Sequence, residues 1–330
     1  MKDAVTSNEI FVEMNKIPII FAIDNNVVMQ CGVTITSLLM NAKPDTYYEI
    51  FILCNHAQLS AENRNFLAKA FDNNKQCKIA FTDVGEAFRE TEEVLHGHVT
   101  KATYYRLSIP SLFPQFDKVI YADIDMIFQQ DLSELFQTAL QHGELVAAVR
   151  DLAIDDKFFF KSPLPAKVGK SEKDYFNAGF LVMNLKLMRE ENIVEEFNRH
   201  AKIKYDQNDQ DVLNVVCKDR VQLLPSMYNF QLNHFSNYMW GRSKTDIAFG
   251  DLFKHATLHY TWKHKPWNSL ECVAYDTWWH YYKMSPFYDD MVYFKRQYGQ
   301  IEASRNDYHN QSNSQLFKRI LANVKHKIVR

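Results

Sequence analysis

Glycine is scarce in this sequence, with nine among 330 residues. The chain contains neither a G-x-G-x-x-G segment nor a G-x-x-x-x-G-K-[ST] segment. Both loops need glycine, because their backbone turns tightly and approaches phosphate oxygens closely. Their absence excludes the glycine-rich dinucleotide loop and the P-loop from this chain.

Cysteine is also sparse, and its spacing matches no common disulfide or zinc pattern. The cysteines are odd in number, widely separated and without a C-x-x-C pair, and no H-E-x-x-H segment occurs. This pattern favours reduced, buried thiols in the cytosol over a disulfide framework or a zinc site. The cysteines are Cys31, Cys54, Cys77, Cys217 and Cys272.

A charge excess and long apolar runs are lacking as well. The formal net charge is -2, which argues against a general nucleic-acid-binding protein. No apolar run reaches the roughly eighteen residues of a membrane span, and residues 1–16 form a polar leader without a signal-peptide core. We therefore expect a cytoplasmic protein. With 46% apolar residues, the chain can bury the core of one large domain, with or without an appendage.

Apolar runs that predict buried strands alternate with segments that predict helices. This alternation predicts an α/β fold with an open, mostly parallel sheet flanked by helices. Ligands bind such sheets beyond the carboxyl ends of the strands. We expect strands at 17–23, 48–54, 78–81, 119–121, 145–149 and 175–184, and helices within 27–43, 60–71, 102–107, 132–136 and 208–216. The first helix should bury Val33, Leu38, Leu39 and Met40, and the second should contain Phe66, Leu67, Ala70 and Phe71.

Two carboxylates follow one of these strands, in the stretch Lys118–Phe128. Asp123 and Asp125 are two positions apart, so on an extended strand they project from the same face. Neighbouring carboxylates repel each other unless a cation lies between them, and their oxygens suit Mg²⁺ or Mn²⁺. The alternative interpretation is that one Asp caps the next helix and the other is solvated.

Polar side chains at other element ends point to the same edge of the sheet. Asp24-Asn25-Asn26 follows the first strand, and Arg150-Asp151 follows the fifth. Ala178 and Gly179 are small enough to let a ligand approach the backbone. Asn208–Asp211 opens a helix, where Asn and Asp are also ordinary caps. Residues 152–174 show no clear period and form either a mobile loop or short helix that folds over a pocket, or an ordinary surface excursion.

Histidines are concentrated between residues 255 and 264. His255 and His259 are four apart, but the residues around His259 favour a strand over a zinc-binding helix. Lone histidines are usually ordinary surface or core groups, so a ligand role needs other support.

The last fifteen residues, 316–330, contain five Lys/Arg and no acid. Leu316, Ile320, Val324 and Ile328 recur every four positions. This predicts an amphipathic basic helix, which either lies on an anionic membrane surface or docks on its own protein.

Six segments, in this order, resemble the retaining glycosyltransferases of family 8, which include bacterial lipopolysaccharide galactosyl- and glucosyltransferases and glycogenin. The resemblance covers about residues 17–285. It implies a GT-A domain there, followed by a helical C-terminal appendage at 286–330. The segments are Phe21–Asn26, Thr103–Leu107, Tyr121–Asp125, Phe176–Gly179, Asn208–Asp211 and His259–Trp267.

The resemblance also implies ligands and residue roles. It implies a UDP-hexose donor, galactose or glucose, and Mn²⁺ with Mg²⁺ as the alternative. The acceptor would be a glycan or glycolipid at the inner face of the cell membrane. The implied metal ligands are Asp123, Asp125 and His259. The implied donor contacts are Ala22, Asp24 and Asn26 to uracil and ribose, Lys265 to the diphosphate, and Arg106, Asp151, Asn177, Ala178, Asp209 and Gln210 around the sugar.

One position departs from the family pattern. The family usually has glycine three residues after the histidine, where its backbone approaches a phosphate, and this chain has Trp262. Either the bulky side chain closes that approach, or the local backbone shifts to compensate.

The implied reaction is hexose transfer with retention at the anomeric carbon. Gln210 is an amide and a poor nucleophile, so we favour front-face attack, in which the departing phosphate oxygen takes the acceptor's proton. Asp209 is the alternative nucleophile. Two other functions stay open: a metal-dependent sugar-nucleotide hydrolase, and a non-catalytic UDP-sugar-binding scaffold.

Overall fold

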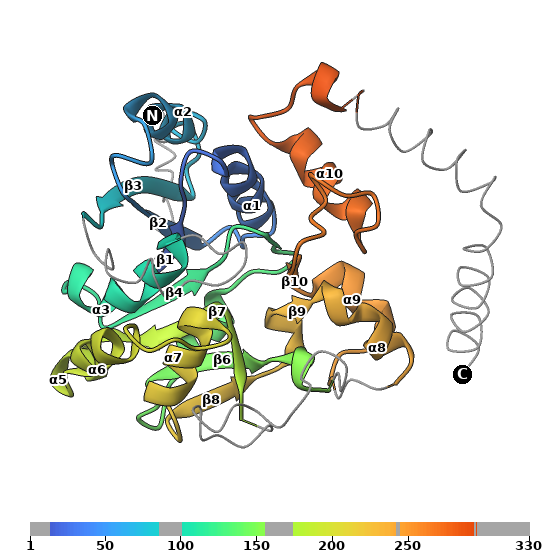
Figure 1. Cartoon of the computed structure of the whole chain (residues 1–330). Helices are drawn as coiled ribbons and strands as arrows, with labels where there is room; N and C mark the ends of the chain where they lie inside the picture. Colours follow the sequence, from blue (N-terminus) through green and yellow to red (C-terminus); the bar gives the residue numbers. More distant parts are fainter. Residues whose placement is uncertain (1–13, 86–100, 156–173, 242–244, 294, 296–330) are drawn as a thin grey trace, which may run out of the picture.

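A computed structural model describes residues 14–85, 101–155, 174–241, 245–293 and 295. It is built around a seven-stranded sheet with the strand order β3-β2-β1-β4-β7-β6-β8. The strands are β1 (Asn15–Ala22), β2 (Thr46–Cys54), β3 (Cys77–Asp83), β4 (Lys118–Ala122), β6 (Val146–Arg150), β7 (Phe176–Asn184) and β8 (Val221–Leu224). Every strand predicted from an apolar run is present. Figure 1 shows this sheet crossing the molecule between groups of helices.

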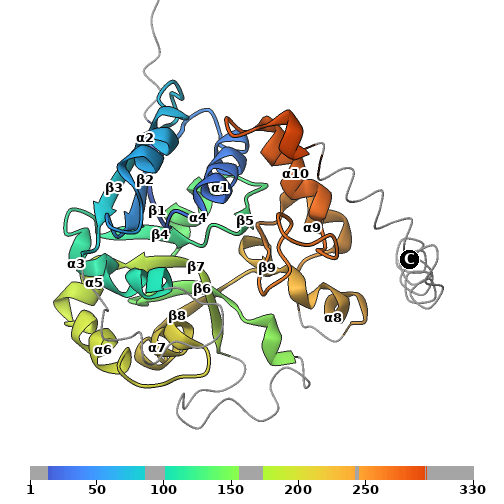
Figure 2. The same ribbon diagram turned by 45° about the horizontal axis from the view of Figure 1, so that its top comes forward.

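Helices cover both faces of the sheet (Figures 1 and 2). Neighbouring residues of β1 point to opposite faces, so Ile19 belongs to one buried apolar cluster and Ile20 to the other. The helices are α1 (Val28–Met40), α2 (Ala61–Lys69), α3 (Ile109–Leu112), α4 (Ser133–Thr138), α5 (Leu185–Glu190), α6 (Ile193–His200), α7 (Asn208–Val216), α8 (Phe235–Met239), α9 (Phe249–His255) and α10 (Tyr275–Met284). The predicted α/β architecture is confirmed.

Local signals account for most helix boundaries and buried faces, with two corrections. Ser60 caps α2 as expected, by accepting a hydrogen bond from the Asn63 amide at 3.2 Å. Met40 was expected on the buried side of its helix, but it is 48% exposed; Phe66 of α2 is 53% exposed. Met40 ends its helix, and Phe66 meets Phe287 edge-on at the surface. The helix expected at 102–107 is a 3₁₀ helix, Lys101–Ser108.

Among the described strands of the large sheet, β7 alone runs antiparallel to its neighbours β4 and β6. Its amino end therefore lies at the edge where the parallel strands have their carboxyl ends. Ala122 of β4 pairs with Phe180, and Arg150 of β6 pairs with Phe176. The residues after β4 and β6 thus meet the first residues of β7 at one edge of the sheet.

A second, three-stranded sheet brings a distant part of the chain to this edge. Strand β10 (Leu258–His259) lies between β5 (Met126–Ile127) and β9 (Phe230–Gln231). His259 pairs with Met126 on one side and with Gln231 on the other. The strand predicted around His259 is therefore present.

The C-terminal part of the described chain packs on α1. A Cβ at Gly32 of α1 would lie 2.0 Å from the Phe287 ring, so helix and ring are in close contact. Asn15 and Lys16, predicted within the polar leader, belong to β1. Residues 1–13 of that leader, most of the loop predicted at 152–174, and the basic segment 316–330 lie outside the described residues. Within the part of the chain that the structure describes, no helix combines the length and apolar character needed to cross a membrane.

Candidate functional site

Two aspartates and a histidine converge at the edge of the sheet. Asp123, Asp125 and His259 each offer one ligand atom, and these atoms lie within 4.8 Å of one another. His259 Nε2 lies 3.2 Å from Asp125 Oδ1 and 3.9 Å from Asp123 Oδ2. Carboxylate oxygens with one imidazole nitrogen suit a divalent cation such as Mn²⁺. The structure therefore brings together the three residues that were predicted as metal ligands.

The aspartates do not lie on a strand face, as the sequence argument assumed. Strand β4 ends at Ala122, and both residues belong to the turn between β4 and β5. The turn is fixed on both sides, because the Asp123 amide donates to the Gly179 carbonyl at 2.8 Å and the Tyr260 amide donates to the Asp125 carbonyl at 2.9 Å. Both neighbouring strands therefore help to place the carboxylates.

Each carboxylate has one oxygen held by a neighbouring donor. Asp123 Oδ1 accepts from Arg106 Nη2 at 2.9 Å and from the Tyr121 hydroxyl at 2.8 Å. Asp125 Oδ2 accepts from Lys265 Nζ. The other oxygen of each residue, Asp123 Oδ2 and Asp125 Oδ1, is the one that approaches His259. This division leaves one oxygen of each carboxylate aimed at the space that a cation would take.

Positive groups determine the charge state of Asp125. Burial alone would raise the pKa of its carboxyl group, but Lys265 and then His259 lower the pKa below its ordinary value. Asp125 is therefore ionised at neutral pH. An ionised carboxylate is the form that binds a cation.

A chain of hydrogen bonds fixes the orientation of His259. Asn177 Nδ2 donates to Asp151 Oδ2 at 3.2 Å, and Asn229 Nδ2 donates to Asn177 Oδ1 at 2.9 Å. Because a carboxylate only accepts, these bonds orient both amides and leave Asn229 Oδ1 facing His259 Nδ1 at 2.8 Å. A neutral imidazole, the form that binds a metal ion, would then carry its proton on Nδ1 and leave Nε2, which faces the two aspartates, as the ligand atom.

Glycine is required beside this imidazole. A Cβ at Gly179 would lie 2.2 Å from His259 Cε1 and 2.9 Å from Nδ1. The space that the sequence analysis reserved for a ligand is filled by the His259 ring. Ala178 is also engaged through its backbone: its amide donates to Gln210 Oε1 at 3.0 Å and its carbonyl accepts from Arg106.

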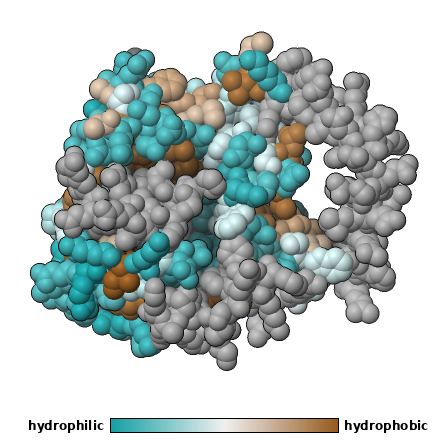
Figure 3. Space-filling model, in the orientation of Figure 1, coloured by the Kyte–Doolittle hydropathy of each residue, from teal (hydrophilic) through white to brown (hydrophobic). Residues whose placement is uncertain are grey.

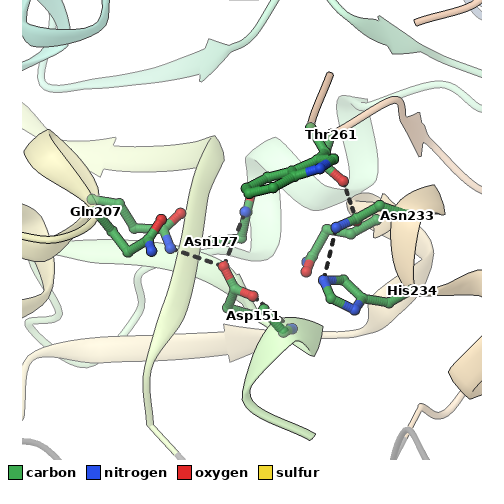
Figure 4. Close-up of a pocket in the computed structure, with 10 residues that line it drawn as sticks. Asp151, Asn177, Gln207, Asn233, His234 and Thr261 are labelled. Carbon is green, nitrogen blue, oxygen red and sulfur yellow. Dashed lines mark hydrogen bonds between the residues drawn. The ribbon is translucent and has the colours of Figure 1, made fainter. Parts of the chain in front are cut away.

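A small polar cavity of about 140 Å³ lies beside the cluster. Asp151 and Asn177 line it, and Gln210 Nε2 donates to Asp151 Oδ2 at 2.8 Å. In Figure 4, Gln207 and Asn177 lie on one side of the cavity, and Asn233 and His234 on the other. This concentration of amides and a carboxylate suits a ligand rich in hydroxyl groups.

Arg106 and Asp209 lie deeper, on the protein side of the aspartate turn. Arg106 is 4% exposed, and its Nε lies 3.0 Å from Asp209 Oδ2. The guanidinium stacks over the Tyr121 ring, 4.4 Å from the ring centroid. Burial raises the pKa of Asp209 to about 7, although Arg106 opposes that shift. Arg106 thus holds Asp123 in place, and Asp209 titrates near neutral pH.

The residues predicted to hold uracil and ribose lie at the same edge of the sheet. Ile20 of β1 pairs with Tyr121 of β4, so Ala22 lies level with Asp123 two residues further along each strand. Asp24 Oδ1 accepts from the Asn26 amide at 2.8 Å, which closes a turn after β1. Ala22, Asp24 and Asn26 are all at least partly exposed.

The structure shows how Trp262 is accommodated at the position where the family usually has glycine. Its φ is 71°, so the backbone adopts the left-handed conformation that glycine adopts easily. Its side chain is 56% exposed and lines the polar cavity. The glycine-like backbone is therefore kept, and the indole forms part of the cavity wall.

Several residues of the site were missed by sequence reasoning. Asn229, which contacts His259, and Asn233 and His234, which line the cavity, stood in no recognised pattern. Tyr121 was assigned to a strand and to the segment Tyr121–Asp125 without a role for its side chain, yet its hydroxyl holds Asp123. The pairing of β9 with β10 places Asn229 beside the site, and that pairing leaves no local signal in two short strands.

A three-layered α/β sheet with an Asp-x-Asp turn and a distant histidine at its carboxyl edge is the arrangement of the GT-A fold. The sequence profile of Glycosyl transferase family 8 matches residues 18–271, and the chain belongs to that family. The resemblance inferred from the six segments is thereby confirmed.

Individual relatives agree with this assignment. A protein of Haemophilus influenzae described as a glycosyltransferase is 30% identical over 220 residues, which is 64% of this chain and 62% of the relative. The lipopolysaccharide 1,3-galactosyltransferase of Salmonella typhimurium is 26% identical over 78% of this chain and 74% of its own length. The crystal structure of galactosyltransferase LgtC has a TM-score of 0.67 at 24% identity, covering 83% of this chain and 98% of LgtC, and shows the same fold.

Proposed function

We propose that this protein transfers a hexose, galactose or glucose, from a UDP-sugar to a hydroxyl group of a glycan or glycolipid, with retention at the anomeric carbon. The observation that carries the proposal is the Asp123–Asp125–His259 cluster beside a polar cavity at the carboxyl edge of the sheet. Membership of family 8 and the similarity to a lipopolysaccharide 1,3-galactosyltransferase support the same activity.

The three clustered residues would hold Mn²⁺, with Mg²⁺ as the alternative. A bound divalent cation supplies positive charge that stabilises a departing diphosphate. Lys265 lies at the cluster, with Nζ bonded to Asp125 and 2.5 Å from the Tyr260 carbonyl. An ammonium group there can add its charge to the leaving phosphate oxygens, where negative charge develops in the reaction.

Asp151, Asn177 and Gln210 would bind the donor hexose. Asp151 has two oxygens that accept from three donors, so its position is fixed before a ligand arrives. A fixed carboxylate and amides can recognise sugar hydroxyl groups with little reorganisation. Ala22, Asp24 and Asn26, at the end of β1, would contact uracil and ribose.

The side-chain geometry favours front-face attack over a covalent intermediate. Gln210 Oε1 accepts from the Ala178 amide, and its Nε2 donates to Asp151 and to the Tyr175 hydroxyl. Asp209 is 3% exposed and lies against Arg106. Neither side chain is presented as a nucleophile. The departing phosphate oxygen would take the proton of the acceptor hydroxyl, while the bond to the anomeric carbon forms on the same face.

A UDP-release assay tests the proposal. We expect UDP release from UDP-glucose or UDP-galactose with Mn²⁺, and loss of release with EDTA. UDP-N-acetylglucosamine serves as the comparison donor. Absence of UDP release from all three donors, together with absence of donor binding, would contradict the proposal.

Product analysis separates the two other functions. A hydrolase would form free hexose at the same rate with and without a glycan acceptor. A scaffold would bind UDP-hexose and Mn²⁺ without turnover. The transferase we propose forms a glycoside whose yield depends on the acceptor, and NMR of that product shows whether the anomeric configuration is retained.

A further inference from the structure

A second cavity, of about 460 Å³, adjoins the polar one. The two share Asn233, Thr261 and Trp262 in their walls. The second cavity extends from this shared wall to the end of α8, where Met239 and the following residue, Trp240, line it. A ligand in the second cavity therefore lies next to a ligand in the first.

The side chains of this second cavity are mainly apolar and aromatic, with a few polar groups. Trp240 is 47% exposed and Trp262 is 56% exposed. Asn233, His264 and Glu271 supply the polar groups. Asn233 is held in place because the Thr261 hydroxyl donates to its Oδ1. His264 is held separately, by a hydrogen bond of 3.2 Å between its Nδ1 and Ser269 Oγ. Mostly apolar walls with a few fixed polar groups are typical of small-molecule sites, and the volume lies in their range.

The backbone of Trp262 supports a binding role for its indole. Its φ of 71° lies in the left-handed region, where a residue with a side chain is strained and glycine is not. Strained residues are concentrated at functional sites, where surrounding structure holds them in place. A tryptophan kept at such a position, with its side chain between two cavities, indicates that the indole contributes something that glycine would not.

We propose that the second cavity is the acceptor subsite and binds a pyranose ring by stacking the ring's apolar face on the indoles of Trp240 and Trp262. This inference rests on the transferase function proposed above. A pyranose has C–H groups on its faces and hydroxyl groups around its rim, which matches aromatic walls with Asn233, His264 and Glu271 nearby. An alkyl chain would make no use of these polar groups.

Because the two cavities share a wall, an acceptor bound in the second cavity would lie next to the donor hexose in the first. An acceptor hydroxyl that reaches past Trp262 enters the cavity lined by Asp151 and Asn177, where the donor hexose would bind. The acceptor oxygen then forms a bond to the anomeric carbon as the bond from that carbon to the diphosphate oxygen breaks. The hydroxyl proton passes to the departing phosphate oxygen, so that atoms and charge balance.

Saturation-transfer NMR on the full chain, without a donor, tests the subsite. The probes are the methyl glycosides of glucose, galactose and N-acetylglucosamine, and lactose, with 1-hexanol as the alkyl probe. We expect at least one saccharide to bind. Trp240→Ala and Trp262→Gly should each weaken binding about three- to tenfold, the loss of one aromatic contact. Phe66→Ala, an equally exposed aromatic residue on α2, should bind like the wild type.

The outcomes are decisive in either direction. No saccharide binding at 100 mM, binding of hexanol alone, or unchanged saccharide binding in folded Trp240→Ala would each overturn the subsite. Saccharide binding that persists when Mn²⁺ and UDP are added supports it, since the two cavities would be filled together. If saccharides bind and both tryptophans matter, yet no UDP-sugar is bound or turned over, the subsite stands and the proposed transferase function fails.

Discussion

Asn229 is fully buried between the two parts of the site. Its amide connects Asn177, in the polar cavity, to His259, in the metal cluster. Residues that hold a ligating histidine are part of a metal site, because they determine which ring nitrogen carries the proton. Through its hydrogen bonds to Asn177 and His259, Asn229 also makes the orientation of the imidazole depend on Asp151 and Asn177.

Replacing Asn229 with Leu should therefore weaken Mn²⁺ binding about 10- to 100-fold, the usual cost of losing such a partner. Isothermal titration of the metal measures this directly, without any turnover. Asn229→Asp, which keeps an oxygen for His259 Nδ1, should retain more affinity than the Leu variant. A folded Leu variant that binds Mn²⁺ as tightly as the wild type would show that Asn229 does not orient His259 for metal binding.

Asp209 should make stability depend on pH. Because its pKa is raised to about 7 in the folded state and is about 4 when unfolded, the folded protein binds the proton more tightly. The carboxyl group therefore favours folding most at low pH, and this contribution decreases as the pH rises from about 4 to 7.

Urea unfolding of the wild type and of Asp209→Asn at several pH values checks this effect. The free energy of unfolding of the wild type, taken relative to the Asn variant, should fall between pH 4 and pH 7 and level off above that. A difference that is constant over this range would show that folding does not shift the pKa of Asp209, and a difference that rises would show that folding lowers it.

At the scale of elements, the contact between α1 and the residues after α10 has little free space. Gly32 faces the ring of Phe287, which is 9% exposed. The α10 segment also packs within itself, with Trp278 and Tyr282 rings stacked at 5.7 Å. The element therefore joins the main core instead of forming a separate unit.

Gly32→Ala should lower the free energy of unfolding by about 1–3 kcal/mol, because the added methyl group overpacks this contact. Alanine's better helix propensity offsets about 1 kcal/mol of that cost. Chemical denaturation measures the change, and Phe287→Leu in the Gly32→Ala background should recover part of it. A Gly32→Ala protein as stable as the wild type would show that the contact is loose.

The elements themselves were largely predictable from the sequence, and their long-range pairings were not. The apolar runs at residues 17–23 and 48–54 indicated β1 and β2, because continuous apolar stretches form buried parallel strands. Ser60 indicated the start of α2. The antiparallel direction of β7 and the pairing of β9 with β10 depend on contacts between distant residues, which no local pattern encodes. For the same reason Asp123 and Asp125 could be identified, but their turn geometry could not.

At the scale of the whole molecule, the described chain places one site at one edge of the sheet. On the face shown in Figure 3, apolar residues form separate brown patches among polar ones. Residues 316–330 lie outside the described part, and their role at an anionic membrane surface stays a prediction from their sequence.

Removing residues 316–330 should release the protein from membrane fractions, since the segment carries five Lys/Arg and no acid. UDP-sugar hydrolysis should persist, because none of the proposed site residues belongs to the segment. Sedimentation with anionic and with neutral vesicles measures the binding. Equal association of the full-length and shortened chains would remove the argument for a membrane role.

The central claim is that Asp123, Asp125 and His259 hold one divalent ion that engages a nucleoside diphosphate. Electron paramagnetic resonance of Mn²⁺, titrated with and without UDP, tests it most directly. The account predicts one bound Mn²⁺ in the wild type, tighter binding when UDP is present, and at least about tenfold weaker binding in folded His259→Ala. Equal Mn²⁺ affinity in the two proteins, or no effect of UDP on the wild type, would contradict it.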